Sequence, residues 1–148
     1  MKPEEKELLL KDLCARLPYG VKIQIEGLKR DIIKDKGIRT LASVLPLRDS
    51  IEYDNRGSNL GVYIDYVKPY LRPMESMTKE EKRKFYDICT SFAKDREHFI
   101  MEGSIDSNYM IEKFDWLNAH HFDYRGLIEK GLAIEVTEEN NPYKEIVL

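Results

Sequence analysis

The sequence is poor in cysteine and tryptophan and has no long apolar run. Its two cysteines, Cys14 and Cys89, are far apart and form no Cys-x-x-Cys pair, so we expect reduced thiols rather than a disulfide framework. The most apolar stretch, residues 41–47, is far too short to span a membrane. Acidic residues near the start do not fit the basic region of a signal peptide, so we expect a cytoplasmic protein with no membrane partner.

Motifs that mark common enzymes are absent as well. The sequence has no Walker A loop, no Rossmann glycine fingerprint and no Gly-x-Ser-x-Gly turn. Cys14 and Cys89 fall on the apolar stripes of expected helices, where a thiol acts as a small hydrophobic side chain. The sequence therefore predicts no catalytic residue and no cofactor, and it favours a protein that is not an enzyme.

The composition is that of a globular domain. Of 148 residues, 42% are hydrophobic and 34% are charged, which suits a single soluble domain over residues 1–148 with a core of its own. The formal net charge is −3, so the chain as a whole gives no reason to expect nucleic-acid binding.

The first 18 residues predict an N-terminal helix. Leu9, Leu13 and Leu17 recur every four residues and form an apolar stripe, with Cys14 beside it. Pro18 marks the end of the helix. Two pairs at a spacing of four are expected to support its solvent face: Glu7 with Lys11, and Asp12 with Arg16.

Residues 20–67 predict a β-rich part. Val21, Ile23 and Ile25 alternate with polar residues, as in a half-buried strand. Residues 30–45 suggest two strands around a tight turn at 35–37. Residues 50–59 are polar and contain glycine, so most of them are expected to form a loop. Residues 60–67 return to a strand, whose inner face is expected to carry Val62, Ile64 and Tyr66.

The remainder, residues 68–148, predicts a connector followed by a mainly helical part. Residues 68–77 contain Pro69 and Pro73, and proline favours an extended residue before it. Thr78 and Glu81 have the spacing of a capping box, which predicts a helix over residues 78–100. Its apolar face is expected to contain Phe85, Cys89, Phe92 and Phe99.

A third helix is expected over residues 108–121, with Met110, Phe114 and Leu117 on one side. Asp123 is placed to cap a short helix over residues 124–130, and Gly131 to end it in a left-handed conformation. Residues 133–136 then predict a terminal strand. The fold class that follows is α+β, with an N-terminal helix, a small antiparallel sheet or partial barrel, and C-terminal helices packing on it.

Histidine and aspartate residues raise the question of a metal site. The candidates are His98, His120, His121 and Asp123. Adjacent residues on a helix point about 100° apart, so His120 and His121 do not suit one shared ion. No His-Glu-x-x-His or Cys-x-x-Cys motif accompanies them. The sequence predicts no metal site and a packed or hydrogen-bonded histidine pair.

One segment gives a local argument for nucleic acid. Five basic residues fall within an expected hairpin: Lys29, Arg30, Lys34, Lys36 and Arg39. Tyrosines on a shared face of the sheet would add stacking surfaces, and the candidates are Tyr53, Tyr63, Tyr66 and Tyr70. The alternative is an ordinary charged sheet edge, where lysine deters unwanted strand pairing.

Two stretches, VKPYLRPMESMT and WLNAHHFDYRGLIEKGLAIE, resemble short uncharacterised proteins of gut Bacteroidales genomes and their phages. The resemblance covers Val67 to Glu135. It implies a bacterial or phage cytoplasm, and no established activity, fold or site residue comes with it.

The leading hypothesis for function is therefore a non-enzymatic binding or accessory protein of a bacterium or phage, with an unknown protein as its partner. A nucleic-acid-binding module that uses the basic hairpin is the first alternative. An enzyme with a histidine and aspartate site is the second.

Overall fold

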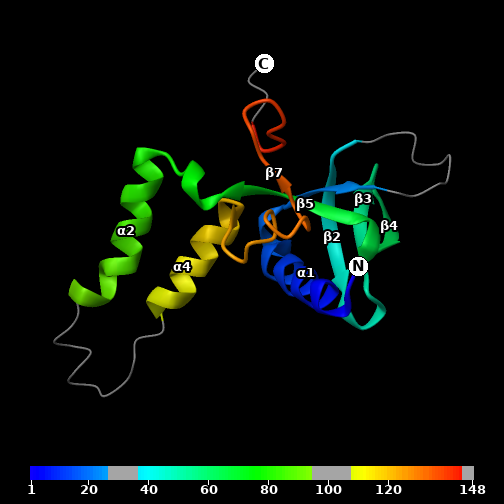
Figure 1. Cartoon of the computed structure of the whole chain (residues 1–148), viewed down its shortest axis with the longest axis horizontal. Coiled ribbons are helices and arrows are strands. Elements are labelled where there is room, and N and C mark those ends of the chain that lie inside the picture. The colour runs from blue at the N-terminus through cyan, green and yellow to red at the C-terminus, as the bar shows by residue number, and fades with distance from the viewer. Residues whose placement is uncertain (27–36, 95–107, 145–148) are drawn as a thin grey trace.

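The computed structural model describes residues 1–26, 37–94 and 108–144 (Figure 1). Within these ranges one helix comes first, five strands follow, and two helices and two very short strands come last. The helices are α1 (Pro3–Arg16), α2 (Lys79–Lys94) and α4 (Asn108–Ala119). The strands are β1 (Lys22–Ile25), β2 (Arg39–Leu45), β3 (Ser50–Asn55), β4 (Ser58–Tyr63), β5 (Val67–Pro73), β6 (Phe122–Asp123) and β7 (Ile134–Glu135).

The strands form one open sheet in the order β4-β3-β2-β1-β5-β6, and β7 also pairs with β5. The pairs among β1 to β5 are antiparallel, whereas β6 and β7 run parallel to β5. This architecture confirms the α+β class, and the sheet is open rather than a closed barrel. None of the helices in the described ranges has the length and apolar content to span a bilayer.

The core lies between α1 and the sheet. Leu9 and Leu13 of α1 are fully buried, as are Ile23 of β1, Ile51 of β3 and Leu71 of β5. The expected stripe of the N-terminal helix and the alternation of the first strand are therefore confirmed. The two neighbouring predictions are wrong, because Cys14 is exposed and the Asp12–Arg16 pair is fully buried rather than on the solvent face.

Residues 50–59, expected to form a loop, are most of a β-hairpin instead. Strands β3 and β4 pair from Ser50↔Tyr63 to Asn55↔Ser58, and the two-residue turn has positive φ at Arg56 (53°) and Gly57 (90°). Two positive φ values define a type I′ turn, whose twist matches that of antiparallel strands. The polar composition of the segment concealed the alternation of buried Ile51 and Tyr53.

The strand expected over residues 60–67 is divided in two. Strand β4 ends at Tyr63, and a 3₁₀ turn over Ile64–Tyr66 leads into β5. Ile64 is fully buried, and its N–H donates to the carbonyl of Asp49 at 2.8 Å. The turn redirects the chain from the edge of the sheet to its middle.

The segment expected to be a connector contains an inner strand of the sheet. Residues 68–72 are extended, as expected, and they belong to β5, which pairs with β1 on one side and with β6 and β7 on the other. Both prolines lie in this strand, Pro69 opposite Ile23 and Pro73 opposite Asp123. An extended backbone before proline suits a strand as well as a linker, and only the neighbouring strands distinguish the two.

Helices α2 and α4 pack against each other and lie on the opposite side of the molecule from β4 (Figure 1). The capping box is confirmed: Thr78 N–H donates to Glu81 Oε1 at 3.0 Å, and Glu81 N–H donates to Thr78 Oγ1 at 3.1 Å. The expected extension to residue 100 lies outside the described residues. In α4 Leu117 is buried, but the expected stripe is wrong at its start, because Met110 and Phe114 are exposed.

The short helix expected over residues 124–130 is a series of turns. Asp123 is the last residue of β6 rather than a helix N-cap, whereas the left-handed conformation expected at Gly131 is confirmed. Gly131 has φ +74°, and its N–H donates to Ile128 O at 3.0 Å, while Leu132 N–H donates to Leu127 O at 2.9 Å. These two bonds are the Schellman pattern. The terminal strand is confirmed as β7, which pairs with β5.

Candidate functional site

The two adjacent histidines have different neighbours. His120 Nδ1 lies 2.9 Å from the carbonyl oxygen of Trp116, and its ring stacks on the indole at 4.2 Å. His121 stacks on Tyr143 at 3.6 Å. In the part of the chain that the structure describes, no three His, Cys, Asp or Glu residues are grouped to hold a metal ion. The pair is packed, as the sequence indicated, and His98 lies outside the described residues.

Asp123 also has a structural role. Its Oδ1 accepts from Leu127 N–H and its Oδ2 from Ile128 N–H, both at 2.9 Å. Both carboxylate oxygens are therefore occupied by the backbone of the turn that follows. The stretch around the histidines is a folded terminus, in which these polar groups bind the chain itself.

The four tyrosines proposed as a stacking surface for nucleic acid do not share one exposed face. Tyr53 and Tyr70 are buried, Tyr66 is half-buried and Tyr63 is exposed, so the expected shared stacking face is wrong. Of the basic residues, Arg39 begins β2 and its Cζ lies 6.0 Å from the ring centroid of Tyr53. The other four, Lys29, Arg30, Lys34 and Lys36, lie outside the described residues, so the basic hairpin remains a prediction.

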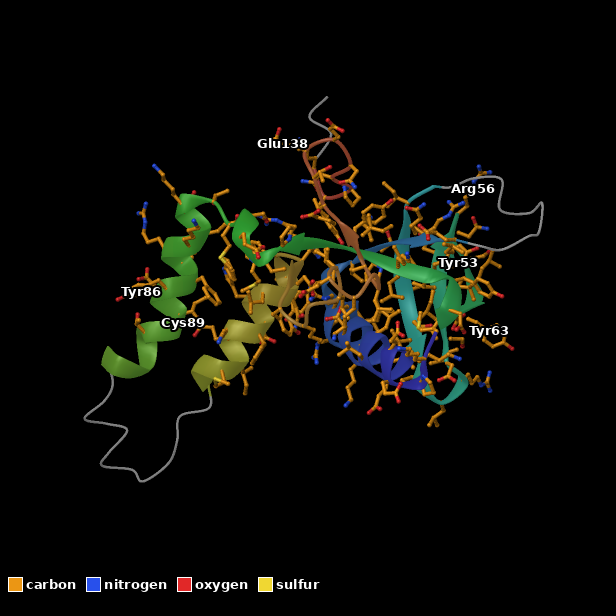
Figure 2. All side chains as sticks on the ribbon, in the orientation of Figure 1. Tyr53, Arg56, Tyr63, Tyr86, Cys89 and Glu138 are labelled. Atoms are coloured by element: carbon orange, nitrogen blue, oxygen red, sulfur yellow. The ribbon has the colours of Figure 1, made fainter. Side chains whose placement is uncertain are left out.

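A more informative surface lies at the free edge of the sheet. Strand β4 pairs with β3 on one side, and no other strand in the described ranges pairs with it. Figure 2 shows Tyr63 projecting from this end of the molecule, far from Tyr86 on α2. The sequence of β4, SNLGVY, contains no charged residue and no proline.

A shallow hollow adjoins this edge on the outer face of β2, β3 and β4. It has a volume of about 600 Å³. We call it the β4 hollow, and its lining side chains and backbone come from Leu45, Arg48, Ser50, Glu52, Gly61, Val62 and Tyr63. Gly61 lies opposite Glu52 and Tyr63 opposite Ser50, so the missing side chain at Gly61 leaves space between larger neighbours.

The polar groups of the β4 hollow differ in how they are engaged. Glu52 Oε1 accepts a hydrogen bond from Ser43 Oγ at 2.9 Å, which fixes the carboxylate against β2. Tyr63 is 63% exposed. An exposed aromatic ring beside a fixed carboxylate and the arginine Arg48 suits recognition of a peptide better than acid–base chemistry, which needs a titrating group in an enclosed site.

Sequence reasoning missed this surface because it assigned residues 50–59 to a loop. A signal was present: Arg56-Gly57 forms a two-residue turn between Ile51 and Tyr53 on one side and Leu60 and Val62 on the other, all spaced by two. Comparison of the chain with protein-family models, curated proteins and solved structures gives no match.

Proposed function

We propose that this chain is a non-enzymatic binding protein, of a bacterium or phage as the resemblance implies, that takes up an extended segment of a partner protein along the free edge of β4. The observation that carries the proposal is an uncharged edge strand whose outer side pairs with no other strand of the described residues and adjoins a hollow. Proteins usually protect such edges with lysine, proline, a bulge or a covering element. Strand addition uses main-chain hydrogen bonds for affinity and a nearby pocket for specificity.

The register identifies the backbone groups that a partner would use. In a two-residue hairpin the closing pair, here Asn55 and Ser58, exchanges both hydrogen bonds, and bonded and non-bonded pairs then alternate. Asn59, Gly61 and Tyr63 are therefore the residues whose N–H and C=O groups point away from β3. An added strand would pair with these three residues.

The hollow supports a preference for a partner side chain that has an apolar body and a polar end, because Arg48, Ser50 and Glu52 also line it. Leu45 and the ring of Tyr63 supply its apolar walls, and side chains of an added strand alternate between the two faces of the sheet. A partner residue opposite Gly61 would direct its side chain toward this space. The partner expected is an extended segment that places such a side chain opposite Gly61.

The test is a selection of random dodecapeptides displayed on phage against the whole protein. Peptides that bind the wild type are measured against Gly61→Pro, which removes an outward N–H, and against Gly61→Ala, which keeps it. The Ala control is tolerated because its Cβ would lie 3.8 Å from Ile51 O, an ordinary contact. We expect Gly61→Pro to weaken binding about tenfold or more, equivalent to about 1.4 kcal/mol, and Gly61→Ala to bind like the wild type.

Amide hydrogen exchange provides the direct readout. A bound peptide should slow exchange at Asn59, Gly61 and Tyr63, and leave Lys82 of α2 unchanged. Thermal melting checks that each variant is folded. If Gly61→Pro does not fold, Asn59→Pro is used in its place. The proposal is wrong if no peptide is enriched, if enriched peptides bind the proline variant equally well, or if protection appears elsewhere.

A further inference from the structure

A second hollow lies beside α1, on a different part of the surface. It has a volume of about 700 Å³, within the range of small-molecule sites. We call it the α1 hollow, and its apolar and thiol wall consists of Pro3, Leu10, Cys14 and Pro46. Arg125, from the turn after β6, also lines it. An apolar wall with one arginine suits a small amphipathic molecule.

The guanidinium of Arg125 lies beside the buried carboxylate of Asp12. Its Nε lies 3.3 Å from Asp12 Oδ1, and Asp12 is fully buried while Arg125 remains 30% exposed. The guanidinium also lies over the ring of Tyr124, with Cζ 5.2 Å from the centroid. These contacts on the Nε side and on one face of the plane restrict the guanidinium, although Nε makes no hydrogen bond to Asp12.

The carboxylate of Asp12 forms ion pairs with two arginines, Arg16 and Arg125. Arg16 Nε donates to Asp12 Oδ2 at 2.7 Å inside the core, and Arg125 approaches the other oxygen. The nearby Asp123 carboxylate is already engaged by two backbone N–H groups. A buried ion pair contributes little to stability by itself, so the arrangement is better explained by its effect on Arg125.

The two lysines that line the α1 hollow form ion pairs with carboxylates, and an aspartate adds a negative charge. Lys11 Nζ lies 3.2 Å from Glu7, and Lys6 Nζ lies 3.5 Å from Asp65. No hydrogen bond from the described residues reaches the terminal Nη nitrogens of Arg125. Asp49, also in the lining, disfavours a ligand with several negative charges. Among the described lining residues, Arg125 therefore presents a guanidinium whose terminal nitrogens are open to a ligand, beside two lysines in surface ion pairs.

We propose that the α1 hollow binds a small monocarboxylate with an apolar body, whose carboxylate pairs with Arg125 while its chain lies against Leu10, Cys14 and Pro46. Arginine matches the two oxygens of a carboxylate with two parallel donors. The site differs from the β4 hollow in its lining residues, although both use the segment of residues 45–50, and the proposal does not rest on peptide binding at β4.

Alkylation of the two cysteines by N-ethylmaleimide provides a test with an internal control. Cys14 lines the hollow, whereas Cys89 lies on α2 at the far side of the molecule (Figure 2). Sodium octanoate, kept below its micelle concentration, should slow alkylation of Cys14 several-fold and leave Cys89 unaffected. Mass spectrometry of the two cysteine peptides over time gives both rates.

Variants separate the carboxylate from the apolar contact. Arg125→Gln should abolish the protection of Cys14, and Lys68→Gln, which removes a surface ion pair with Glu26 elsewhere, should leave it intact. If Arg125→Gln does not fold, Cys14→Phe fills the hollow without touching the arginine and should abolish octanoate binding by calorimetry. Equal protection by octan-1-ol, or no protection by octanoate, overturns the proposal.

Discussion

The ring of His121 stacks on that of Tyr143 with centroids 3.6 Å apart and planes 10° from parallel. The Tyr143 hydroxyl donates to Tyr70 O at 2.7 Å and accepts from Lys22 N–H at 3.0 Å. The segment after β7 is thus attached to β1 and β5 through one tyrosine. His121 itself has φ +63°, a conformation that costs most side chains about 1 kcal/mol, and the stacking offsets part of that cost.

The first prediction concerns acid sensitivity. Burial, followed by the positive charges of Arg16, His120, Arg72 and Lys22, lowers the pKa of His121 to about 4. The unfolded chain, with an ordinary pKa near 6.5, binds the proton first as pH falls. Stability should therefore be complete above about pH 6.5 and decline toward pH 4, by about 1–2 kcal/mol after solvent screening.

Denaturant titrations of the wild type and His121→Asn between pH 7 and pH 4 measure this effect. Asparagine tolerates the left-handed backbone and does not titrate in this range. The variant should lose less stability than the wild type over the interval. Parallel curves for the two proteins would show that His121 does not cause the decline.

The second prediction concerns a lower pH range. The hydrogen bonds from Arg72, at 2.7 and 2.8 Å, lower the pKa of Glu81 from 4.5 to about 2. The unfolded chain takes up the proton first, so this contribution is present above about pH 4.5 and is lost as pH falls toward 2. Glu81→Gln should cost about 1–2 kcal/mol at pH 7, allowing for screening, and almost nothing at pH 2. Glu80→Gln, in the same helical turn but exposed, should have little effect at either pH.

The third prediction concerns backbone geometry at Gly131. The space around its Cβ position is open, so a substitution there tests conformation without a steric clash. Gly131→Val should lower the free energy of unfolding, measured by denaturant titration, by about 1–2 kcal/mol, because φ is +74° and a β-branched residue disfavours it. Gly61→Ala, in a strand, should be neutral or slightly stabilising. A Gly131 variant as stable as the parent would contradict the argument.

The fourth prediction concerns the capping carboxylate. Asp123→Ala leaves the N–H groups of Leu127 and Ile128 without their acceptors, and should cost about 1–3 kcal/mol. Asp123→Asn keeps one acceptor oxygen. Its melting temperature should therefore lie between those of the wild type and Asp123→Ala. Asp87→Ala, at an exposed position on α2, is the matched control and should change the melting temperature little. An equal effect of both alanine substitutions would remove the special role of Asp123.

Local signals in the sequence predicted those features whose interacting residues lie within a few positions of each other along the chain. The capping box of Thr78 and Glu81, the left-handed Gly131 and the apolar stripe of α1 all follow from spacing, because both partners of each contact lie on the same short segment. The Asp12–Arg16 spacing was recognised too, but the sequence could not show that both side chains are buried.

Tertiary structure alone decided the features that depend on which strands are neighbours. Residues 67–73 have the proline pattern of a linker and become an inner strand because β1, β6 and β7 supply hydrogen-bond partners on both sides. The same holds for the free edge of β4 and for the meeting of Arg125 with Asp12, 113 residues apart in numbering. Strand order and buried charge are set by contacts between distant segments, and periodicity within one segment carries no information about them.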